Sequence, residues 1–243
     1  MMVSDFHSHI LPRIDDGSAS LEESVKMLRM EQNQGISRVV ATPHFYAHRD
    51  TMDRFLHRRE RAAEQLREAL ADHPDLPQVI LGAEVYFFPG ISETESLGEL
   101  AIAGTDCVLI EMPVSSWTDK MYRELEQIPE KQGLQPIIAH VDRYMVPLHK
   151  NSHITRLLQL PVLIQANAGF FLRRSTAMTA MRMLKQDKIQ FLGSDCHNLD
   201  TRAPNLGPAV ERIRKKLGDD PLLRICQWEN TCLESKGNKE SSL

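Results

Sequence analysis

The chain contains few cysteines, and they are not arranged as a scaffold. Cys107, Cys196, Cys226 and Cys232 include no Cys-x-x-Cys pair. The sequence therefore gives no indication of a disulfide framework or of a structural thiolate zinc site. We expect the thiols to stay reduced, and we interpret Cys107, which lies in an apolar run, as a small buried side chain.

Long hydrophobic runs are also lacking. No stretch approaches the roughly 18 apolar residues that a membrane-spanning helix needs. The first residues lead straight into an apolar run, without the charged and then apolar pattern of a secretory leader. We therefore expect a cytoplasmic protein that does not insert into a membrane.

The chain has no excess of positive charge. Its 29 Lys and Arg face 33 Asp and Glu, which gives a formal net charge of −4, and aromatic residues make up 6%. This balance, without a basic stripe interleaved with aromatics, argues against a nucleic-acid partner. No Gly-rich phosphate loop follows the first apolar run, which argues against a dinucleotide-binding fold.

The sequence does contain a regular alternation of short apolar runs and longer amphipathic segments. It predicts an α/β fold of one domain over residues 1–236, with a polar, disordered tail over 237–243. Seven strand–helix repeats without a long linker indicate a parallel sheet closed into a barrel. The predicted strands are Val3–His9, Arg38–Pro43, Gln78–Glu84, Cys107–Glu111, Pro136–His140, Val162–Ala166 and Ile189–Gly193.

Amphipathic segments between these runs predict the helices. Ser20 and Glu23 form a capping-box pattern that opens a helix towards Gln34, with Gly35 as its stop. The other predicted helices are Met52–Ala71, Thr118–Gln132, Ser152–Gln159, Ser175–Gln186 and Pro208–Leu217.

A His-x-His pair in the first predicted strand is the most informative local feature. Side chains two apart on a strand point to the same face, so His7 and His9 project together and can share a divalent metal ion. Metal-ligand side chains recur at the ends of later strands, and in a βα barrel those ends meet at one mouth. The complete set is His7, His9, Asp16, His44, Glu84, Glu111, His140, Asp195 and His197.

Nine such side chains at one mouth are too many for a single ion and suit two or three. Glu84 and Glu111 each end an apolar run, where a buried carboxylate is costly unless a cation pairs with it. Imidazole and carboxylate ligands, with no thiolate, favour Mn, Fe or Zn.

Several strings around these residues resemble the polymerase and histidinol phosphatase (PHP) superfamily. Within it they are most similar to the manganese-dependent tyrosine phosphatases of bacterial capsule and exopolysaccharide loci. The strings are Asp5-Phe6-His7-Ser8-His9-Ile10-Leu11-Pro12, Ile14-Asp15-Asp16-Gly17, Ala41-Thr42-Pro43-His44, Ala139-His140-Val141-Asp142-Arg143-Tyr144, Gln165-Ala166-Asn167-Ala168-Gly169 and Gly193-Ser194-Asp195-Cys196-His197.

The resemblance implies a distorted seven-stranded, TIM-like PHP barrel that holds three divalent metal ions, with Mn favoured. One ion would take His7, His9, Glu84 and Asp195. A second would share Glu84 and add Glu111 and His140, and the third would use Asp16, His44 and His197.

The same resemblance assigns catalytic and substrate-binding roles to two arginines and implies a reaction. Arg143 and Arg202 match positions that bind phosphate. A metal-bound hydroxide would hydrolyse phosphotyrosine, on the tail of a bacterial tyrosine kinase that controls polysaccharide synthesis. Arg13 departs from the family pattern, where a small residue is expected, and the general acid and the oligomeric state stay open.

One motif points to a different mechanism. Cys196 and Arg202 match the Cys-x5-Arg signature of cysteine-dependent phosphatases. We reject it, because the span contains no glycine to wrap a loop round phosphate and places Asp200 where the anion would bind. An aromatic pair, Phe45 and Tyr46, follows His44 and either lines the mouth of the pocket or packs in a helix or loop.

Four other functions remain as alternatives. The same chemistry suits a small-molecule phosphatase such as a histidinol-phosphate phosphatase, and the superfamily also contains nucleases and phosphodiesterases. A non-catalytic metal-binding protein is disfavoured by the complete ligand set. An amidohydrolase also begins with His-x-His, but its usual bridging group is a modified lysine, where this chain has Glu84 and Glu111.

Overall fold

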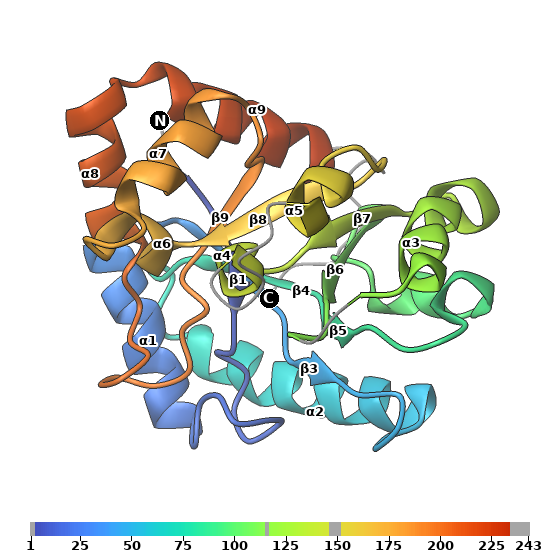
Figure 1. Cartoon of the computed structure of the whole chain (residues 1–243). Helices are drawn as coiled ribbons and strands as arrows, with labels where there is room; N and C mark the ends of the chain where they lie inside the picture. Colours follow the sequence, from blue (N-terminus) through green and yellow to red (C-terminus); the bar gives the residue numbers. More distant parts are fainter. Residues whose placement is uncertain (1–2, 115–116, 146–151, 234–243) are drawn as a thin grey trace.

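A computed structural model describes residues 3–114, 117–145 and 152–233, so the predicted tail over 237–243 lies outside the described residues. Parallel strands occupy the centre of the molecule and helices surround them (Figure 1). Within the described residues the strands are β1 (Asp5–Ser8), β2 (Arg38–Ala41), β3 (His44–Phe45), β4 (Gln78–Leu81), β5 (Glu84–Tyr86), β6 (Cys107–Glu111), β7 (Gln135–Ile138), β8 (Leu163–Asn167) and β9 (Phe191–Gly193).

Two predicted strands, Arg38–Pro43 and Gln78–Glu84, stop earlier than expected as β2 and β4, and each is followed by a second short strand. Thr42 and Pro43 separate β2 from β3, and Gly82 and Ala83 separate β4 from β5. These strands still run side by side, since the Glu84 amide donates to the Pro43 carbonyl over 3.0 Å. Pro43 has no N–H to give to a ladder, which explains why the regular pairing stops there.

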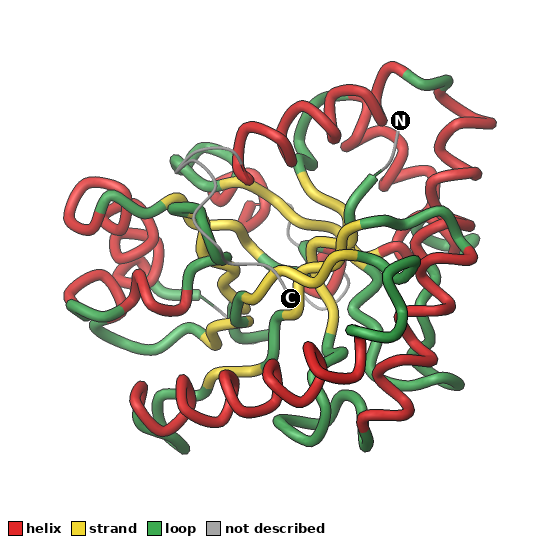
Figure 2. The backbone as a smooth tube through the Cα atoms, turned by 180° about the vertical axis from the view of Figure 1, so that it is seen from behind, coloured by secondary structure: helices red, strands yellow, loops and turns green. Residues whose placement is uncertain are grey.

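The strands follow one another around a barrel in the order β1, β2/β3, β4/β5, β6, β7, β8 and β9, with every pair parallel. The wall continues from β9 back to β1, where the Asp195 amide donates to the His7 carbonyl over 2.7 Å. The His9 amide donates to the Cys196 carbonyl over 2.9 Å. The prediction of an α/β, TIM-like barrel is confirmed, and Figure 2 shows the strands from the other side.

Helices cover the outside of the strands. Six match predicted segments: α1 (Leu21–Asn33), α2 (Met52–Leu70), α3 (Asp119–Gln132), α5 (Ser152–Leu157), α7 (Ala177–Lys185) and α8 (Leu206–Leu217). The sequence did not predict α4 (Asp142–Met145), α6 (Ala168–Leu172), α9 (Asp220–Leu233) or the 3₁₀ turns η1 (Ile91–Glu93) and η2 (Leu97–Leu100).

The start of α1 follows the predicted capping pattern with one difference. The Ser20 hydroxyl accepts from the Glu23 amide over 3.1 Å, as a capping box requires. The Glu23 carboxylate, however, accepts from the amide of Ala19 rather than that of Ser20, over 2.7 Å. The helix then buries Met27 and Leu28 completely against the barrel.

Inside the barrel, an apolar layer lies beneath a polar one. Leu109 and Phe191 belong to a buried apolar cluster, and Phe6 stacks on Phe191 with ring centres 4.4 Å apart. Because alternate residues of a strand share a face, Glu111 follows Leu109 on the same side two residues later. The apolar layer thus forms the floor of the polar site at the carboxyl ends of the strands.

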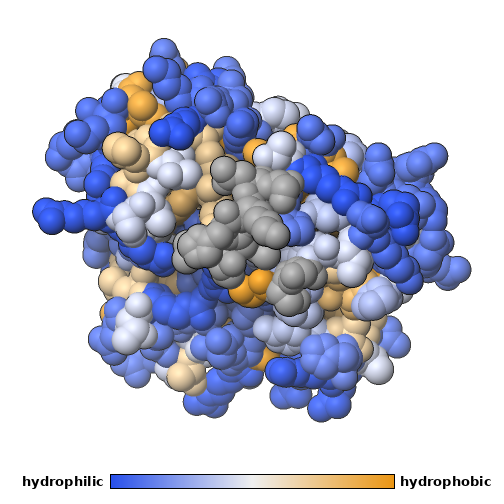
Figure 3. All heavy atoms as spheres, viewed as in Figure 1, coloured by the Kyte–Doolittle hydropathy of each residue, from blue (hydrophilic) through white to orange (hydrophobic). Residues whose placement is uncertain are grey.

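The face of the molecule seen in Figure 3 is mainly polar. On the face drawn in Figure 3, hydrophilic residues predominate and hydrophobic ones form small separate areas. Within the described residues, no helix is both long and apolar enough to cross a bilayer. A cytoplasmic location stays a prediction.

Candidate metal centre at the mouth of the barrel

The nine side chains predicted as metal ligands meet at the mouth of the barrel, with Glu84 near the centre. Glu84 Oε2 lies 3.2 Å from His7 Nε2, 3.3 Å from His9 Nε2 and 2.9 Å from His44 Nδ1. Glu84 Oε1 lies 2.8 Å from His140 Nε2. One carboxylate therefore contacts four imidazoles, which come from the ends of three strands, β1, β3 and β7.

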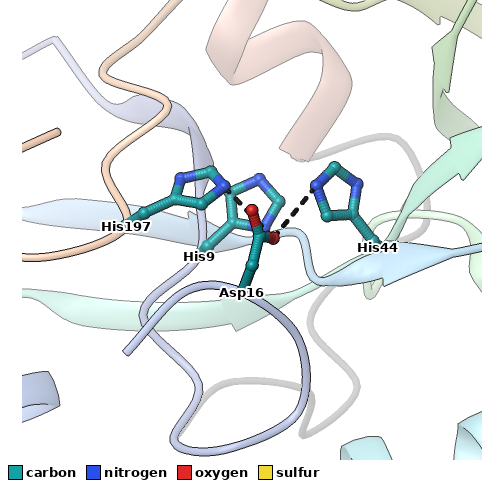
Figure 4. Close-up of side chains that lie close together, drawn as sticks. All are labelled: His9, Asp16, His44 and His197. Atoms are coloured by element: carbon teal, nitrogen blue, oxygen red, sulfur yellow. Dashed lines mark ion pairs between the residues drawn. The ribbon is translucent and has the colours of Figure 1, made fainter. Parts of the chain in front are cut away.

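A second gathering lies around Asp16, in the loop that follows β1. Its Oδ1 atom is 3.4 Å from His44 Nε2 and 3.5 Å from His197 Nε2, the two contacts marked in Figure 4. The ring of His9 lies beside that of His197, with centres 3.8 Å apart. Residues from the first and last parts of the chain thus form one wall of the site.

These side chains form three overlapping groups rather than three separate ones. In each group, one donor atom per residue lies within 4.8 Å of the others. His9 belongs to two groups, as does His44, whereas the sequence assigned each of them to one ion. The groups are His7, His9 and Asp195; His44, Glu84 and Glu111; and His9, Asp16, His44 and His197.

His140 completes this arrangement from the end of β7. Its Nε2 atom lies 2.8 Å from Glu84 Oε1 and 3.4 Å from Glu111 Oε1. His140 and Asp195 both have positive φ, 31° and 55°. Backbone strain of this kind in non-glycine residues is concentrated at functional sites, where it fixes the direction of a side chain.

Two glycines allow the strands and loops of the site to approach closely. A Cβ atom on Gly193 would lie 2.6 Å from His7 Cβ and 2.7 Å from Gln165 Nε2. A Cβ atom on Gly17 would lie 2.3 Å from the His9 carbonyl oxygen. Neither position has room for a side chain, so glycine is required beside both His7 and His9.

Asp15 orients His9, a role that the sequence did not assign. Its Oδ2 atom lies 2.7 Å from His9 Nδ1 and also accepts from the His44 amide over 2.9 Å. Because Asp15 holds a proton on Nδ1, Nε2 is the nitrogen of His9 that would bind a cation. Asp15 and Asp16 are adjacent in sequence, and only the structure separates the orienting carboxylate from the one in the site.

Gln165 and Asn167 on β8 are two further residues that sequence reasoning left without a role. Gln165 Oε1 accepts from the His140 amide over 2.5 Å and lies 3.3 Å from His7 Nδ1. Asn167 Nδ2 donates to Asp195 Oδ2 over 2.8 Å. Their spacing of two residues on one strand puts both on the face of the site, which was the available signal.

Arg143 and Arg202 both reach Asp195. Arg143 Nη2 contacts Asp195 Oδ2 at 2.5 Å, and Arg202 Nη2 contacts Asp195 Oδ1 at 2.7 Å. Arg202 also approaches Asp16, and each arginine side chain is 35% exposed. The two guanidinium groups therefore lie at the edge of the site, within reach of solvent.

The site carries several carboxylates, whose negative charge holds protons on His9 and His140. Burial alone would lower the pKa of His9, but the charge and hydrogen bond of Asp15, together with Glu84, raise it to about 10. Burial also opposes protonation of His140, and the carboxylates of Glu111 and Glu84 raise its pKa to about 9. In the opposite direction, burial and the charge of His9 lower the pKa of His197 to about 3.

The arrangement fits divalent cations. Several buried donor atoms have no hydrogen bond of acceptable geometry within the described residues: His44 Nδ1, Glu84 Oε2, His140 Nδ1 and His197 Nε2. Two imidazole nitrogens, His7 Nε2 and His9 Nε2, also lie 3.2 Å apart and face Glu84 Oε2 together. Cations among these nitrogen and oxygen donors would satisfy them and offset the carboxylate charge.

Cys196 has no part in this arrangement. Its side chain is fully buried in a group with Asp5 and Glu31, and burial raises the pKa of the thiol well above its ordinary value. Arg202 contacts Asp195 instead of forming a phosphate loop with the thiol. The geometry supports the rejection of the Cys-x5-Arg motif as a catalytic signature.

The fold and site define an α/β-barrel protein with a buried histidine–carboxylate centre at the carboxyl ends of its strands. The family described as "Capsular polysaccharide synthesis, CpsB/CapC" matches residues 3–233. The chain belongs to this CpsB/CapC family.

Relatives of known function match most of the chain. It is 30% identical over 226 residues to the tyrosine-protein phosphatase CpsB of Streptococcus pneumoniae, covering 88% of this chain and 90% of that one. It is 28% identical over 229 residues to the tyrosine-protein phosphatase YwqE of Bacillus subtilis (strain 168), covering 89% and 85%.

A solved structure shares the fold. It comes from crystal structures of YwqE from Bacillus subtilis and CpsB from Streptococcus pneumoniae, described as unique metal-dependent tyrosine phosphatases. The match has a TM-score of 0.82 at 24% identity and covers 97% of this chain and 96% of the other.

Proposed function

We propose that the protein is a metal-dependent protein-tyrosine phosphatase. The observation that carries this proposal is the gathering of nine imidazole and carboxylate side chains at one mouth, with two arginines at its edge. The activity named for the curated relatives, tyrosine-protein phosphatase, agrees with that chemistry.

The ligand set that we propose accommodates three divalent ions, with manganese favoured. His7, His9, Glu84 and Asp195 would hold the first ion. Glu84, Glu111 and His140 would hold the second, and Asp16, His44 and His197 the third. When bound, such ions neutralise the charge on phosphoryl oxygens and lower the pKa of water towards 7, which yields a nucleophile at neutral pH.

Arg143 and Arg202 would bind the phosphoryl group of the substrate. Each guanidinium presents parallel N–H donors that match two oxygens of a phosphate. Both arginines are anchored by Asp195, which fixes their position, and both remain partly exposed. They can thus contact a phosphoryl group that enters from solvent while staying attached to the site.

The leaving group of phosphotyrosine needs little assistance from a proton donor. A phenol has a pKa of about 10, so the phenolate departs more readily than the alkoxide of a serine would. Tyr46, at the mouth, keeps its proton because burial and the charges of Glu111, Glu84 and Asp16 raise its pKa. The reaction on phosphotyrosine therefore does not depend on a strong general acid.

The partner that we propose is a phosphotyrosine protein, namely the tail of a bacterial tyrosine kinase that controls capsule or exopolysaccharide synthesis. The family description places related chains in capsular polysaccharide synthesis. A substrate of this kind is a flexible segment, which can extend its side chain into the mouth of a barrel.

A substrate panel tests this function. Purified protein loaded with Mn²⁺ is assayed on a phosphotyrosine peptide, the matched phosphoserine peptide, histidinol phosphate and single-stranded DNA. We expect the highest kcat/KM on the phosphotyrosine peptide. Faster turnover of histidinol phosphate would establish a small-molecule phosphatase instead, and cleavage of DNA would establish a nuclease.

A further inference from the structure

Two tyrosines stand at the outer edge of the proposed catalytic site. Tyr46 follows β3 two residues after His44, and Tyr86 ends β5 two residues after Glu84. His44 and Glu84 are register partners in neighbouring strands. Because alternate residues share a face, both tyrosines lie one step outward from these two residues on the same wall of the barrel.

Contacts between the rings support this placement. The Tyr46 and Tyr86 ring centres are 5.5 Å apart, and the Tyr46 ring lies 5.1 Å from that of His44. Both tyrosines are half-buried, whereas Phe45 is buried and packs on Phe55. Of the aromatic pair that follows His44 in the sequence, only Tyr46 reaches the mouth.

Tyr46 also borders a cavity that opens next to the metal centre. This cavity has a volume of about 530 Å³, and its lining includes Asp16, His44, Tyr46 and Arg49. The guanidinium of Arg49 lies 5.0 Å from the centre of the Tyr46 ring. A space of this size accommodates an amino-acid side chain with its neighbouring peptide groups.

We propose that Tyr46 and Tyr86 form an aromatic wall that binds the phenyl ring of the substrate and selects aryl over alkyl phosphate esters. This inference rests on the proposed phosphatase function and names the residues that would give it specificity. When a phosphoryl group lies among the donors of the site, an aryl substituent extends outward by one side-chain layer. That layer is the one Tyr46 and Tyr86 occupy, whereas the shorter serine side chain does not fill it.

The expected energetic effect follows from aromatic packing. Stacked or edge-on aromatic pairs contribute beyond simple burial by an amount that corresponds to about a 2- to 10-fold change in an equilibrium or a specificity ratio. Each tyrosine should contribute a factor of this size to the preference for an aryl phosphate. The hydroxyl groups are not needed for it.

Paired substitutions separate the ring from its hydroxyl. Tyr46→Leu and Tyr86→Leu remove a ring, whereas Tyr46→Phe and Tyr86→Phe keep it. For each variant, kcat/KM is measured on a phosphotyrosine peptide and on the matched phosphoserine peptide. The leucine variants should lower the phosphotyrosine-to-phosphoserine ratio by about 2- to 10-fold each, and the phenylalanine variants should leave it near the wild-type value.

A binding measurement supplies a readout that does not depend on turnover. Isothermal titration calorimetry of the Mn²⁺-loaded protein gives the Kd of phenylphosphonate and of ethylphosphonate. The wild type should bind the phenyl compound more tightly, and the leucine variants should lose that difference.

The outcomes are distinguishable. If the wild type does not hydrolyse the phosphotyrosine peptide, the proposed function fails. The wild type could instead hydrolyse the peptide while the leucine variants keep both the wild-type kcat/KM ratio and the wild-type difference in Kd. In that case the proposal that Tyr46 and Tyr86 bind the phenyl ring is wrong. If a phenylalanine variant lowers the phosphotyrosine-to-phosphoserine ratio as much as its leucine counterpart does, the hydroxyl and not the ring gives the preference, and the proposal is overturned.

Discussion

Asp15 and Asp16 have identical side chains and adjacent positions, yet they contact different parts of the site. Asp15 lies behind His9 and its Oδ2 atom accepts from His9 Nδ1, whereas Asp16 approaches the Nε2 atoms of His44 and His197. Gly17 packs directly against the His9 backbone, so the loop after β1 is held close to the site. At this scale, function depends on which ring nitrogen each carboxylate faces.

Asp15→Asn should weaken metal binding without removing a proposed ligand. The amide can still contact His9 but no longer stabilises the Nδ1–H tautomer with a full charge. Loss of such an orienting partner typically lowers metal affinity by about 10- to 100-fold. Calorimetric titration of the chelated protein with Mn²⁺ measures this affinity, and Glu64→Gln on the exposed face of α2 serves as the control. Unchanged affinity in Asp15→Asn would show that Asp15 does not orient a ligand.

Cys196→Ser should keep most of the phosphatase activity, because the thiol is buried and its raised pKa keeps it protonated. Treatment of the wild type with a chelator should abolish activity. Both are measured as kcat on a phosphotyrosine peptide. The reverse pair of results, an inactive serine variant and a chelator-resistant wild type, would assign the mechanism to the thiol.

At the level of helices and strands, the site depends on how closely β9 approaches β1. Gly193→Ala would force its new methyl group to within 2.6 Å of His7 Cβ. Overpacking of this kind costs about 1–3 kcal/mol, so the free energy of unfolding should fall by that amount or more. Urea unfolding of the chelated protein measures it. Gly98→Ala is the matched control, since the nearest neighbour of its new methyl group would be Leu134 Cδ2 at 4.0 Å. An equal loss of unfolding free energy in both variants would contradict the close approach of β9 to β1.

Helix α9 is attached to the start of β1 through a buried carboxylate. Both oxygens of Glu229 accept from the Ser4 amide, at 3.1 and 3.0 Å. Burial raises the pKa of Glu229 to about 8, against hydrogen bonds from Ser4 and the charge of Arg38, which lower it. The carboxyl group is therefore protonated more readily in the folded protein than in the unfolded chain.

This pKa predicts a pH-dependent stability. A carboxyl group whose pKa is raised on folding stabilises the native state at low pH, and that contribution is lost as pH rises from about 4.5 to about 8. Glu229→Gln removes the titration, so the wild type should lose stability relative to this variant across that range. Thermal melting of both chelated proteins at several pH values tests this, with the exposed Glu126→Gln as control. Parallel pH profiles of the wild type and Glu229→Gln would rule out the effect.

The sequence predicted well those elements whose signal is local. The run Cys107–Glu111 forms β6 with the predicted bounds, because five consecutive buried residues leave little ambiguity. Helix α9 was missed because Glu229 interrupts its apolar face, and the contacts with Ser4 and Arg38 that explain a buried carboxylate there are far away in the sequence. The short strand β3, which follows the predicted end at Pro43, was not predicted either, since it is defined by its pairing with β5.

The candidate site was predictable in its composition but not in its connections. The ends of parallel strands converge in any βα barrel, so the side chains that end them could be gathered from the sequence alone. Hydrogen bonds made by Asp15, Gln165 and Asn167 depend on side-chain directions across strands far apart in the chain. His9 and His44 each belong to two groups of possible metal ligands, and this too depends on side-chain directions that the sequence does not give.

At the level of the whole molecule, the barrel places an apolar floor beneath a charged mouth. Carboxylates in the site (Asp15, Asp16, Glu84, Glu111 and Asp195) outnumber its arginines by five to two, so the folded chain concentrates negative charge at one end. Such charge opposes folding unless cations offset it. Binding of metal ions should therefore increase the stability of the whole folded chain.

Titration of the chelated protein with Mn²⁺, following metal content, melting temperature and phosphotyrosine-peptide turnover in the same samples, tests the central claim most directly. The proposed centre predicts about three ions per chain by its ligand count, a rise in melting temperature as they bind, and activity that appears only with them. Full activity in metal-free protein, or a melting temperature and turnover that do not respond to added ions, would contradict it.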